Sequence, residues 1–147
     1  MKAKELIKNA QKKIVISGWK REVEEIKKEL ITAKNRGIEN TIFSFTNIDK
    51  KLGKIVSYEL DEDDLRKIWT PKIIMVVDNQ HTIMGSTKKT EDCKAILTKN
   101  TAINEIATNH IILDITLAGQ RLGFDSDPYV KNIMRDPAEN LQHLLNI

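Results

Sequence analysis

The sequence predicts an α/β fold, a mixed sheet with flanking helices, and three observations support this. Short β-branched runs alternate with segments in which apolar residues recur every three or four positions, as strands and helices do. A strand, a helix of about sixteen residues and a second strand fill residues 14–45, so these two strands should be parallel. Residues 73–84 favour a hairpin, which is antiparallel, so the sheet should be mixed.

The composition fits one soluble domain. The chain has 147 residues, of which 40% are hydrophobic and 31% charged, enough for a single core. No run approaches the roughly 18 apolar residues of a membrane span, and the N-terminus lacks the apolar centre of a secretion signal. We therefore expect a cytoplasmic protein without membrane contact. Cys93 is the only cysteine, so an internal disulfide is excluded.

The charge pattern does not favour direct nucleic-acid binding. The 24 basic residues against 21 acidic ones give a net charge of +3, and the lysines are scattered among glutamates. A dedicated nucleic-acid binder usually concentrates positive charge on one face and adds aromatic residues for stacking. Here aromatic residues make up 5% and lie apart from the lysines, so the sequence gives no support to direct DNA contact.

The first part of the chain predicts a helix, a strand and a second helix. An apolar stripe predicts a helix over 4–12, which lacks an evident N-cap, so residues 1–12 are expected to be the end of a linker helix. The run 14–16 predicts a strand. Over 20–36 the apolar residues recur at helical spacing, and Gly37 supplies the left-handed residue that stops a helix.

The next part predicts a second strand, an edge strand and a short helix. Residues 41–45 alternate, with Ile42 on one face and Phe43 on the other. Residues 54–60 predict a short edge strand. The acidic run 59–64 favours a helix start, because negative charge is stabilised there, and Trp69 is expected in the core.

A central hairpin follows. Residues 73–77 are uninterrupted apolar residues rich in β-branching, which suits a strand covered on both faces. The Asp-Asn-Gln sequence at 78–80 tolerates turn geometry, and residues 81–84 return as the partner strand. Gly85-Ser86 ends that strand where a ligand or another backbone could approach closely, and where a hydroxyl and amides could bind an anion.

The last part predicts one strand and several helices. Residues 93–98 favour a strand, and residues 102–119 favour a helix with a broad apolar surface. His110 and Asp114 share a face of that helix. Because no further ligands accompany them, we expect a hydrogen-bonded structural pair and no metal site. Residues 128–147 should form C-terminal helices that pack on the domain or on a second chain.

The hairpin resembles the core of the phospholipase D superfamily. In its enzymes a strand carries His-x-Lys-x4-Asp, the His attacks a phosphodiester, and Gly-Ser with a following Asn completes the phosphate site. Here Lys72 fits the Lys and Gly85-Ser86 fits the Gly-Ser, whereas Thr70 occupies the His position, Asp78 lies one position late and Lys88 replaces the Asn. The resemblance implies a phospholipase D-like mixed sheet with flanking helices and no nucleophile.

Over residues 5–118 the chain is similar to the C-terminal domain of TrmB-like transcriptional regulators. The similarity rests on the order of four segments: residues 10–19, a helix ending in Asn-Arg-Gly at 35–37, the hairpin, and residues 97–103 running into 110–114. Members of that family join a winged helix-turn-helix to a phospholipase D-like domain that has lost its catalytic His. In the better-known members this domain senses sugars and takes part in dimerisation.

This resemblance implies that residues 1–147 are a single regulatory domain that touches DNA only through a helix-turn-helix domain absent from this chain. We expect a homodimer that binds a small effector, a sugar or a phosphorylated metabolite, without a cofactor, a metal or catalytic residues. The ligand should lie outside the carboxyl ends of the parallel strands. The predicted ligand-binding residues are Ser17, Gly18, Trp19, Ser44, Lys72, Gly85, Ser86 and Thr87.

Several alternatives stay open. Trp19 could stack on a sugar face or simply plug a helix start, and Lys72 could fix a phosphate or remain a solvated amine. The chain could be a purely structural dimerisation domain. A phospholipase D-type phosphodiesterase is less favoured, because phosphoryl chemistry of this kind needs an activated nucleophile. None of His81, His110 and His143 precedes a Lys at the required spacing.

Overall fold

The computed structural model describes residues 2–86 and 95–134 and confirms the predicted mixed sheet. Its six strands lie in the order β3-β2-β1-β4-β5-β6. They are β1 (Lys13–Gly18), β2 (Glu39–Thr46), β3 (Lys54–Leu60), β4 (Ile73–Val77), β5 (His81–Gly85) and β6 (Ile96–Thr98). Strands β1, β2 and β3 are parallel, whereas β4 is antiparallel to β1 and the pairs β4–β5 and β5–β6 are also antiparallel.

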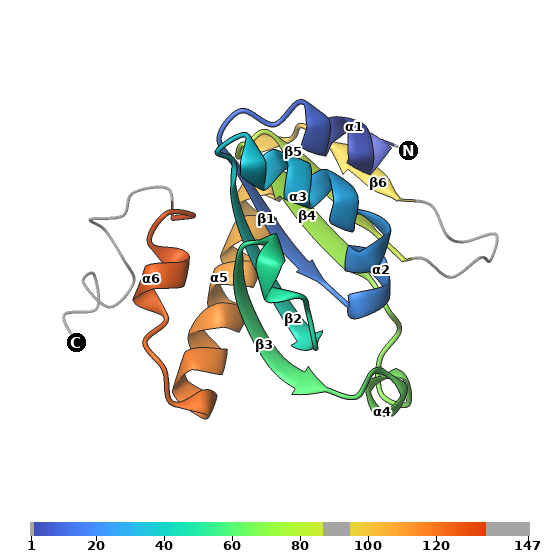
Figure 1. Ribbon diagram of the computed structural model, residues 1–147, viewed down its shortest axis with the longest axis vertical. Helices are drawn as coiled ribbons and strands as arrows, with labels where there is room; N and C mark the ends of the chain where they lie inside the picture. Colours follow the sequence, from blue (N-terminus) through green and yellow to red (C-terminus); the bar gives the residue numbers. More distant parts are fainter. Residues whose placement is uncertain (1, 87–94, 135–147) are drawn as a thin grey trace.

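Helices cover both faces of this sheet. They are α1 (Lys2–Lys8), α2 (Lys20–Glu25), α3 (Lys27–Asn35), α4 (Glu62–Arg66), α5 (Thr101–Leu122) and α6 (Asp127–Val130), with a 3₁₀ turn η1 (Lys50–Leu52) before β3. In Figure 1, α1, α2 and α3 lie in front of the strands and the long α5 crosses behind them, with α6 beside it. The architecture is therefore three layers, with the sheet in the middle.

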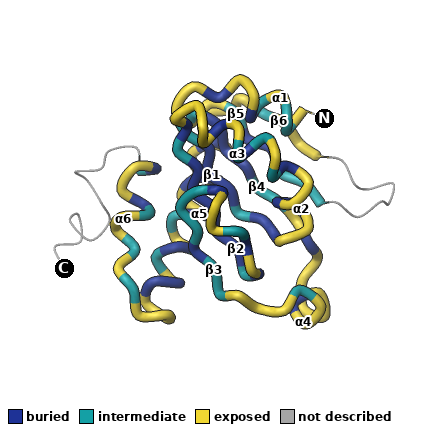
Figure 2. Tube along the Cα trace, viewed as in Figure 1, coloured by how far each residue is buried: buried dark blue, intermediate teal, exposed yellow. Residues whose placement is uncertain are grey.

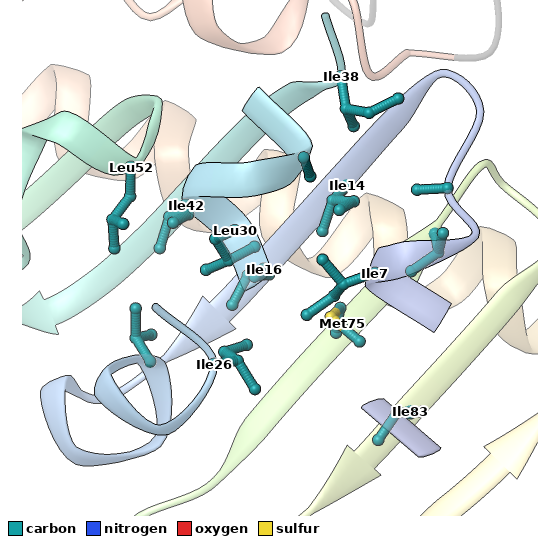
Figure 3. Close-up of a cluster of buried hydrophobic side chains, with 14 of the residues drawn as sticks. Ile7, Ile14, Ile16, Ile26, Leu30, Ile38, Ile42, Leu52, Met75 and Ile83 are labelled. Carbon is teal, nitrogen blue, oxygen red and sulfur yellow. The ribbon is translucent and has the colours of Figure 1, made fainter. Parts of the chain in front are cut away.

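The front layer is held by an apolar cluster between α1, α3 and the sheet. Ile14 and Ile16 of β1 point to this face, together with Ile42 of β2, and they pack against Leu30 of α3. Figure 3 shows these side chains with Met75 of β4 beside them. All five are fully buried, and burying each contributes roughly 1.5–3 kcal/mol relative to exposure.

The rear layer is a second cluster built from the alternate strand positions. Val15 and Phe43 point to this face and pack with Ile111 and Ile115 of α5. The prediction that Ile42 and Phe43 face opposite sides of the sheet is confirmed. Because both faces are covered, the central strands are dark blue along most of their length in Figure 2.

Two helix boundaries differ from the prediction. The helix expected over 20–36 is split at Ile26, a β-branched residue with φ −112° and ψ 11°, whose side chain is 2% exposed. Helix α5 continues past Gly119. The lack of a side chain at Gly119 lets residues 124–126 pack close, because an added Cβ would lie 2.9 Å from the Phe124 carbonyl oxygen. The helix instead ends at Gly123, which has φ 75°.

The ends of the chain also differ in detail. Helix α1 ends at Lys8 rather than at residue 12, and the Arg36 guanidinium donates to the carbonyl oxygens of Ile7 and Ala10, each at 3.2 Å. Strand β6 begins at Ile96, later than the predicted 93, and residues 93–94 lie outside the described residues. So does the segment 135–147 of the predicted C-terminal helices. No helix in the described ranges combines the length and apolarity that crossing a membrane requires.

Candidate functional site

A small cavity lies where β1 and β2 end and β4 begins. Ser17 of β1 stands beside Phe43 of β2 and opposite Ile74 of β4, so the three strand ends meet at one edge of the sheet. The cavity, which we call the cradle, has a volume of about 80 Å³. Its lining residues are Ser17, Gly18, Trp19, Ser44, Phe45, Trp69, Lys72, Ile74, His110 and Asp114.

The structure brings most of the predicted ligand-binding residues together and leaves others out. Ser17, Gly18, Trp19, Ser44 and Lys72 all line the cradle. Gly85 and Ser86 are not among the described residues that line it, and Thr87 lies outside the described residues. An added Cβ on Gly85 would lie 3.1 Å from the Ala95 Cα, so this glycine serves the approach of another backbone segment.

Ser44 is fixed in a buried hydrogen-bond network at the end of β2. Its Oγ lies 3.0 Å from Thr46 Oγ1 and accepts the Thr46 backbone N–H at 3.0 Å. The backbone N–H of Lys20, the first residue of α2, donates to Thr46 Oγ1 at 2.8 Å. The network therefore ties the start of α2 to the end of β2 and holds the floor of the cradle in place.

Aromatic rings form one wall of the cradle. The Phe45 ring stacks on Tyr58 with centroids 5.6 Å apart and contacts Trp69 at 5.1 Å. The prediction that Trp69 belongs to the core is wrong: it is 48% exposed, because it follows the short α4 at the margin of the sheet. Trp19, by contrast, is only 4% exposed, so it fills the start of α2 while also lining the cavity.

A His–Asp pair from α5 completes the cradle. His110 Nε2 lies 3.2 Å from Asp114 Oδ2, one helical turn away, so the two side chains are paired along the helix as predicted, as an ion pair when the imidazole is protonated. Burial raises the pKa of the Asp114 carboxyl, and the charge of His110 opposes that rise. Sequence reasoning did not place this pair at the site, because His110 is 38 positions after Lys72. One feature of the sequence could have indicated this placement. The apolar residues of α5 have to cover the sheet face of Phe43, and this brings polar residues of the same helix close to the ends of the strands.

The cradle has the chemistry of an anion site of limited size. Lys72 is exposed and its amine lines the same cavity as the His110 imidazole and the Ser17 hydroxyl. The Asp114 carboxyl also lines it and is paired with His110. Whole small molecules usually occupy pockets of roughly 300–1,000 Å³. A cavity of about 80 Å³ instead suits one phosphate or carboxylate group, with the rest of a ligand outside.

The family model described as "Transcriptional regulator TrmB, EBD N-terminal subdomain" matches residues 1–109. The chain belongs to the TrmB family of transcriptional regulators. The match concerns the N-terminal subdomain of the EBD, whereas the resemblance seen in the sequence implied the C-terminal domain of a regulator. That placement within a longer TrmB-family protein stays a prediction. No curated protein matches the sequence significantly.

Solved structures share the fold of this TrmB-family domain. The archaeal chromatin protein TrmBL2, whose structure "shows a novel mode of DNA binding", is 13% identical with a TM-score of 0.55 over 75% of this chain. That match covers 45% of TrmBL2, so the chain spans less than half of its length. NucT from Helicobacter pylori is 14% identical, with a TM-score of 0.54 over 75% of this chain and 82% of NucT. Nuc from Salmonella typhimurium, a phospholipase D family member, is 16% identical, with a TM-score of 0.51 over 74% of this chain and 80% of Nuc.

Asp78 of this TrmB-family domain lies far from the cradle, at the other end of β4 from Lys72. Its carboxylate accepts the backbone N–H groups of Gln11, Lys12 and Lys13 at 2.8, 2.7 and 3.0 Å. Burial by itself would raise the pKa of Asp78, but these three hydrogen bonds lower it below its usual value. Asp78 therefore clasps the segment before β1 and takes no part in the cradle.

Proposed function

We propose that this TrmB-family domain is a non-catalytic regulatory module that binds a phosphorylated metabolite, such as a sugar phosphate, and pairs with a second copy of itself. It acts in the cytoplasm and influences DNA only through a separate helix-turn-helix domain. The observation that carries the proposal is the cradle, where Lys72 and His110 border a cavity the size of one anionic group. Thr70 stands at the position where the related enzymes carry a nucleophilic His.

The wall of the cradle supports a sugar phosphate over a bare anion. Trp69 is half exposed, and its ring borders the cavity that also holds Lys72. With the phosphate beside the amine and the imidazole, the sugar ring would extend toward this indole, which offers an apolar face for stacking. Charge-assisted hydrogen bonds to Lys72 would supply most of the selectivity for the phosphate.

The direct test is ligand binding to the full chain. Glucose 6-phosphate, inorganic phosphate and glucose are compared by thermal shift and calorimetry, and the phosphorylated sugar should bind most tightly. A saturating ligand at about 100 times its Kd stabilises the fold by roughly 2.7 kcal/mol, which raises Tm by about 5–10 °C for a chain of this size.

Two lysine variants make the test specific. Lys72→Ala should weaken glucose 6-phosphate binding by about tenfold or more, since a hydrogen bond to a charged group is lost. Lys67→Ala is the matched control, because Lys67 is 77% exposed and its ammonium pairs with Asp64 at 3.4 Å. If neither phosphate nor the sugar phosphate raises Tm, effector binding at the cradle is wrong and a purely structural role gains support.

An exposed apolar stripe on α5 supports dimerisation. Ile103, Ile106, Leu113 and Leu117 are 37%, 66%, 57% and 45% exposed. With His110 between them they follow steps of three and four residues, the spacing of a coiled-coil seam. A helix that is apolar on its outer side as well as toward the sheet is usually covered.

Sedimentation of the full chain tests the dimer. The parent should sediment as a dimer, and Leu113→Glu should shift it to a monomer, because a buried unpaired carboxylate is costly. Ile68→Glu is the control, since Ile68 is 72% exposed and lies outside α5. A parent chain that sediments as a monomer, or a Leu113→Glu variant that remains dimeric, would exclude pairing through α5.

One observation favours a second candidate, a phosphodiesterase. His110 shares the cradle with Lys72, and Asp114 could orient the imidazole as acidic partners do for catalytic histidines. The proposal predicts that the chain hydrolyses bis(p-nitrophenyl) phosphate no faster than its His110→Ala variant. Turnover by the parent that disappears in His110→Ala would establish the enzyme instead.

A further inference from the structure

A second and larger cavity lies by the β4–β5 turn, away from the cradle. It measures about 280 Å³, and we call it the turn cavity. Its lining residues are Asn79, Thr101, Asn104, Glu105, Thr108, Asn109 and Ile133, none of which lines the cradle. Its volume is close to the lower end of the roughly 300–1,000 Å³ range of small-molecule sites. A whole small metabolite therefore fits here, whereas the cradle admits one group.

Buried polar side chains are fixed in the wall of the turn cavity. Asn104 is 4% exposed and Thr108 is 7% exposed. The hydroxyl of the fully buried Thr82 donates to Asn104 Oδ1, so the amide NH₂ is the end of Asn104 that is left to donate. The Thr108 hydroxyl donates to the Asn104 carbonyl at 2.8 Å, so its oxygen is left to accept. The wall thus offers a donor and an acceptor at set positions.

The rim adds neutral hydrogen-bonding groups and one negative charge. Asn79 and Asn109 contribute amides, Thr101 contributes a hydroxyl and Glu105 a carboxylate. Among the described residues that line the cavity there is no Lys, Arg or His, so none of these side chains neutralises a phosphate or a carboxylate. Asn79 is also held in place, since it has φ 55° in a turn anchored by the Asp78 carboxylate.

We infer that the turn cavity binds an uncharged small molecule that carries several hydroxyl or amide groups. Neutral amide and hydroxyl side chains match such groups as both donors and acceptors, and Glu105 accepts from a ligand hydroxyl or N–H. Glu105 also repels anions, because no cation accompanies it among the described lining residues, whereas in the cradle Asp114 is paired with His110 and Lys72 lies in the same lining. The two cavities therefore differ in ligand class, and this inference does not depend on the proposed function.

Matched pairs of probes test the inference on the full chain. Glucose, ribose and uridine are each compared with glucose 6-phosphate, ribose 5-phosphate and uridine 5′-monophosphate by amide chemical shifts in NMR spectra. At least one uncharged probe should shift the signals of residues 101–109 and Asn79, and its phosphorylated counterpart should bind there about tenfold more weakly. The inference is wrong if none of the three uncharged probes shifts these signals, or if the phosphorylated forms bind there equally well.

Substitutions test whether the uncharged probe binds in the turn cavity. Thr108→Val keeps the shape but removes the hydroxyl acceptor, so binding of the uncharged probe should weaken about three- to tenfold. Asn109→Trp places an indole at the rim and should abolish binding, whereas Gln120→Trp on the exposed part of α5 should not. Lys72→Ala should leave this binding unchanged, which separates the turn cavity from the cradle. Unaltered affinity in both Thr108→Val and Asn109→Trp would refute the assignment.

Discussion

Replacing Asp78 with Asn tests the three hydrogen bonds that join the β4–β5 turn to the segment before β1. Oδ1 accepts the N–H groups of Lys12 and Lys13 at 2.7 and 3.0 Å, and Oδ2 accepts that of Gln11 at 2.8 Å. In Asp78→Asn the amide oxygen can keep the first two as neutral hydrogen bonds, but the NH₂ group faces the Gln11 N–H. The Asp78 backbone has φ 53°, a conformation that Asn tolerates, so backbone strain does not add to the effect.

The expected loss follows from these contacts. Two hydrogen bonds to a charged acceptor become hydrogen bonds to a neutral one, at roughly 0.5–1 kcal/mol each, and the exposed Gln11 N–H is left facing another donor, at roughly 1 kcal/mol. Because the carboxylate is partly exposed and screened by solvent, we expect the lower end of the sum, about 2 kcal/mol. For a chain of 147 residues this corresponds to a fall in Tm of about 4–8 °C.

The pH dependence carries a definite sign. The pKa of Asp78 is lower in the folded chain than its unfolded value of about 3.9. Its contribution is therefore complete above the unfolded pKa and is lost as the pH falls through the folded pKa. Urea unfolding of the parent and Asp78→Asn should differ by the full amount at pH 7 and pH 5, and by progressively less below about pH 4.

This prediction has a matched control variant and two results that would contradict it. Asp61 caps α4 through one N–H from Asp63 at 2.8 Å, and Asn caps helices equally well, so Asp61→Asn should change stability by less than about 0.5 kcal/mol. The reasoning fails if Asp78→Asn unfolds within about 0.5 kcal/mol of the parent at pH 7. It fails equally if the difference stays constant from pH 5 to pH 2.

Three further predictions concern stability and are checked by urea or thermal unfolding. Gly53→Ala should lower the free energy of unfolding by roughly 2–4 kcal/mol, because the new Cβ would clash with the Asn40 carbonyl oxygen. Gly37→Ala is the control: Gly37 has φ 92° with open space around it, so the loss should be only about 1–2 kcal/mol. Equal losses in the two variants would contradict this prediction. Ile111→Ala, at a fully buried position, should cost about 2–5 kcal/mol, and a loss below 1 kcal/mol would argue against the packing of α5. Because the folded pKa of Asp114 is raised, the stability that this carboxyl contributes is present below its unfolded pKa and is lost as the pH rises through its folded pKa. The Tm of Asp114→Asn should therefore rise relative to the Tm of the parent between pH 4 and pH 7. A relative fall in the Tm of the variant would contradict the raised pKa.

The parts of the fold that follow from local periodicity were predictable from the sequence. The opposite placement of Ile42 and Phe43, the edge strand over 54–60 and the turn at 78–80 all depend on neighbours within a few residues. The break at Ile26 did not follow, because the helical spacing of the apolar residues continues across it.

The candidate site was predictable only in part. Ser17 and Ser44 were placed together because the carboxyl ends of parallel strands identify one edge of a sheet, and Lys72 was assigned through its fit to the Lys of the phospholipase D motif. Trp69 and His110 enter the cradle through the packing of α4 and α5, which no local pattern specifies. Asp78 was compared with a motif by spacing alone. The motif puts the Asp at position 77, the last residue of β4, whereas Asp78 lies one residue later in the turn, where its carboxylate accepts the backbone N–H groups of the segment before β1.

Helix α5 contributes side chains to the cradle and the turn cavity, and it carries the exposed stripe between Ile103 and Leu117. A single rigid rod of 22 residues is thus shared by two cavities and a contact face. If filling one cavity tilts or slides this rod, thermodynamic reciprocity requires that filling the other change the first affinity by the same factor. Any substitution in α5 should accordingly be assayed for both affinities and for self-association before its effect is assigned to one of them.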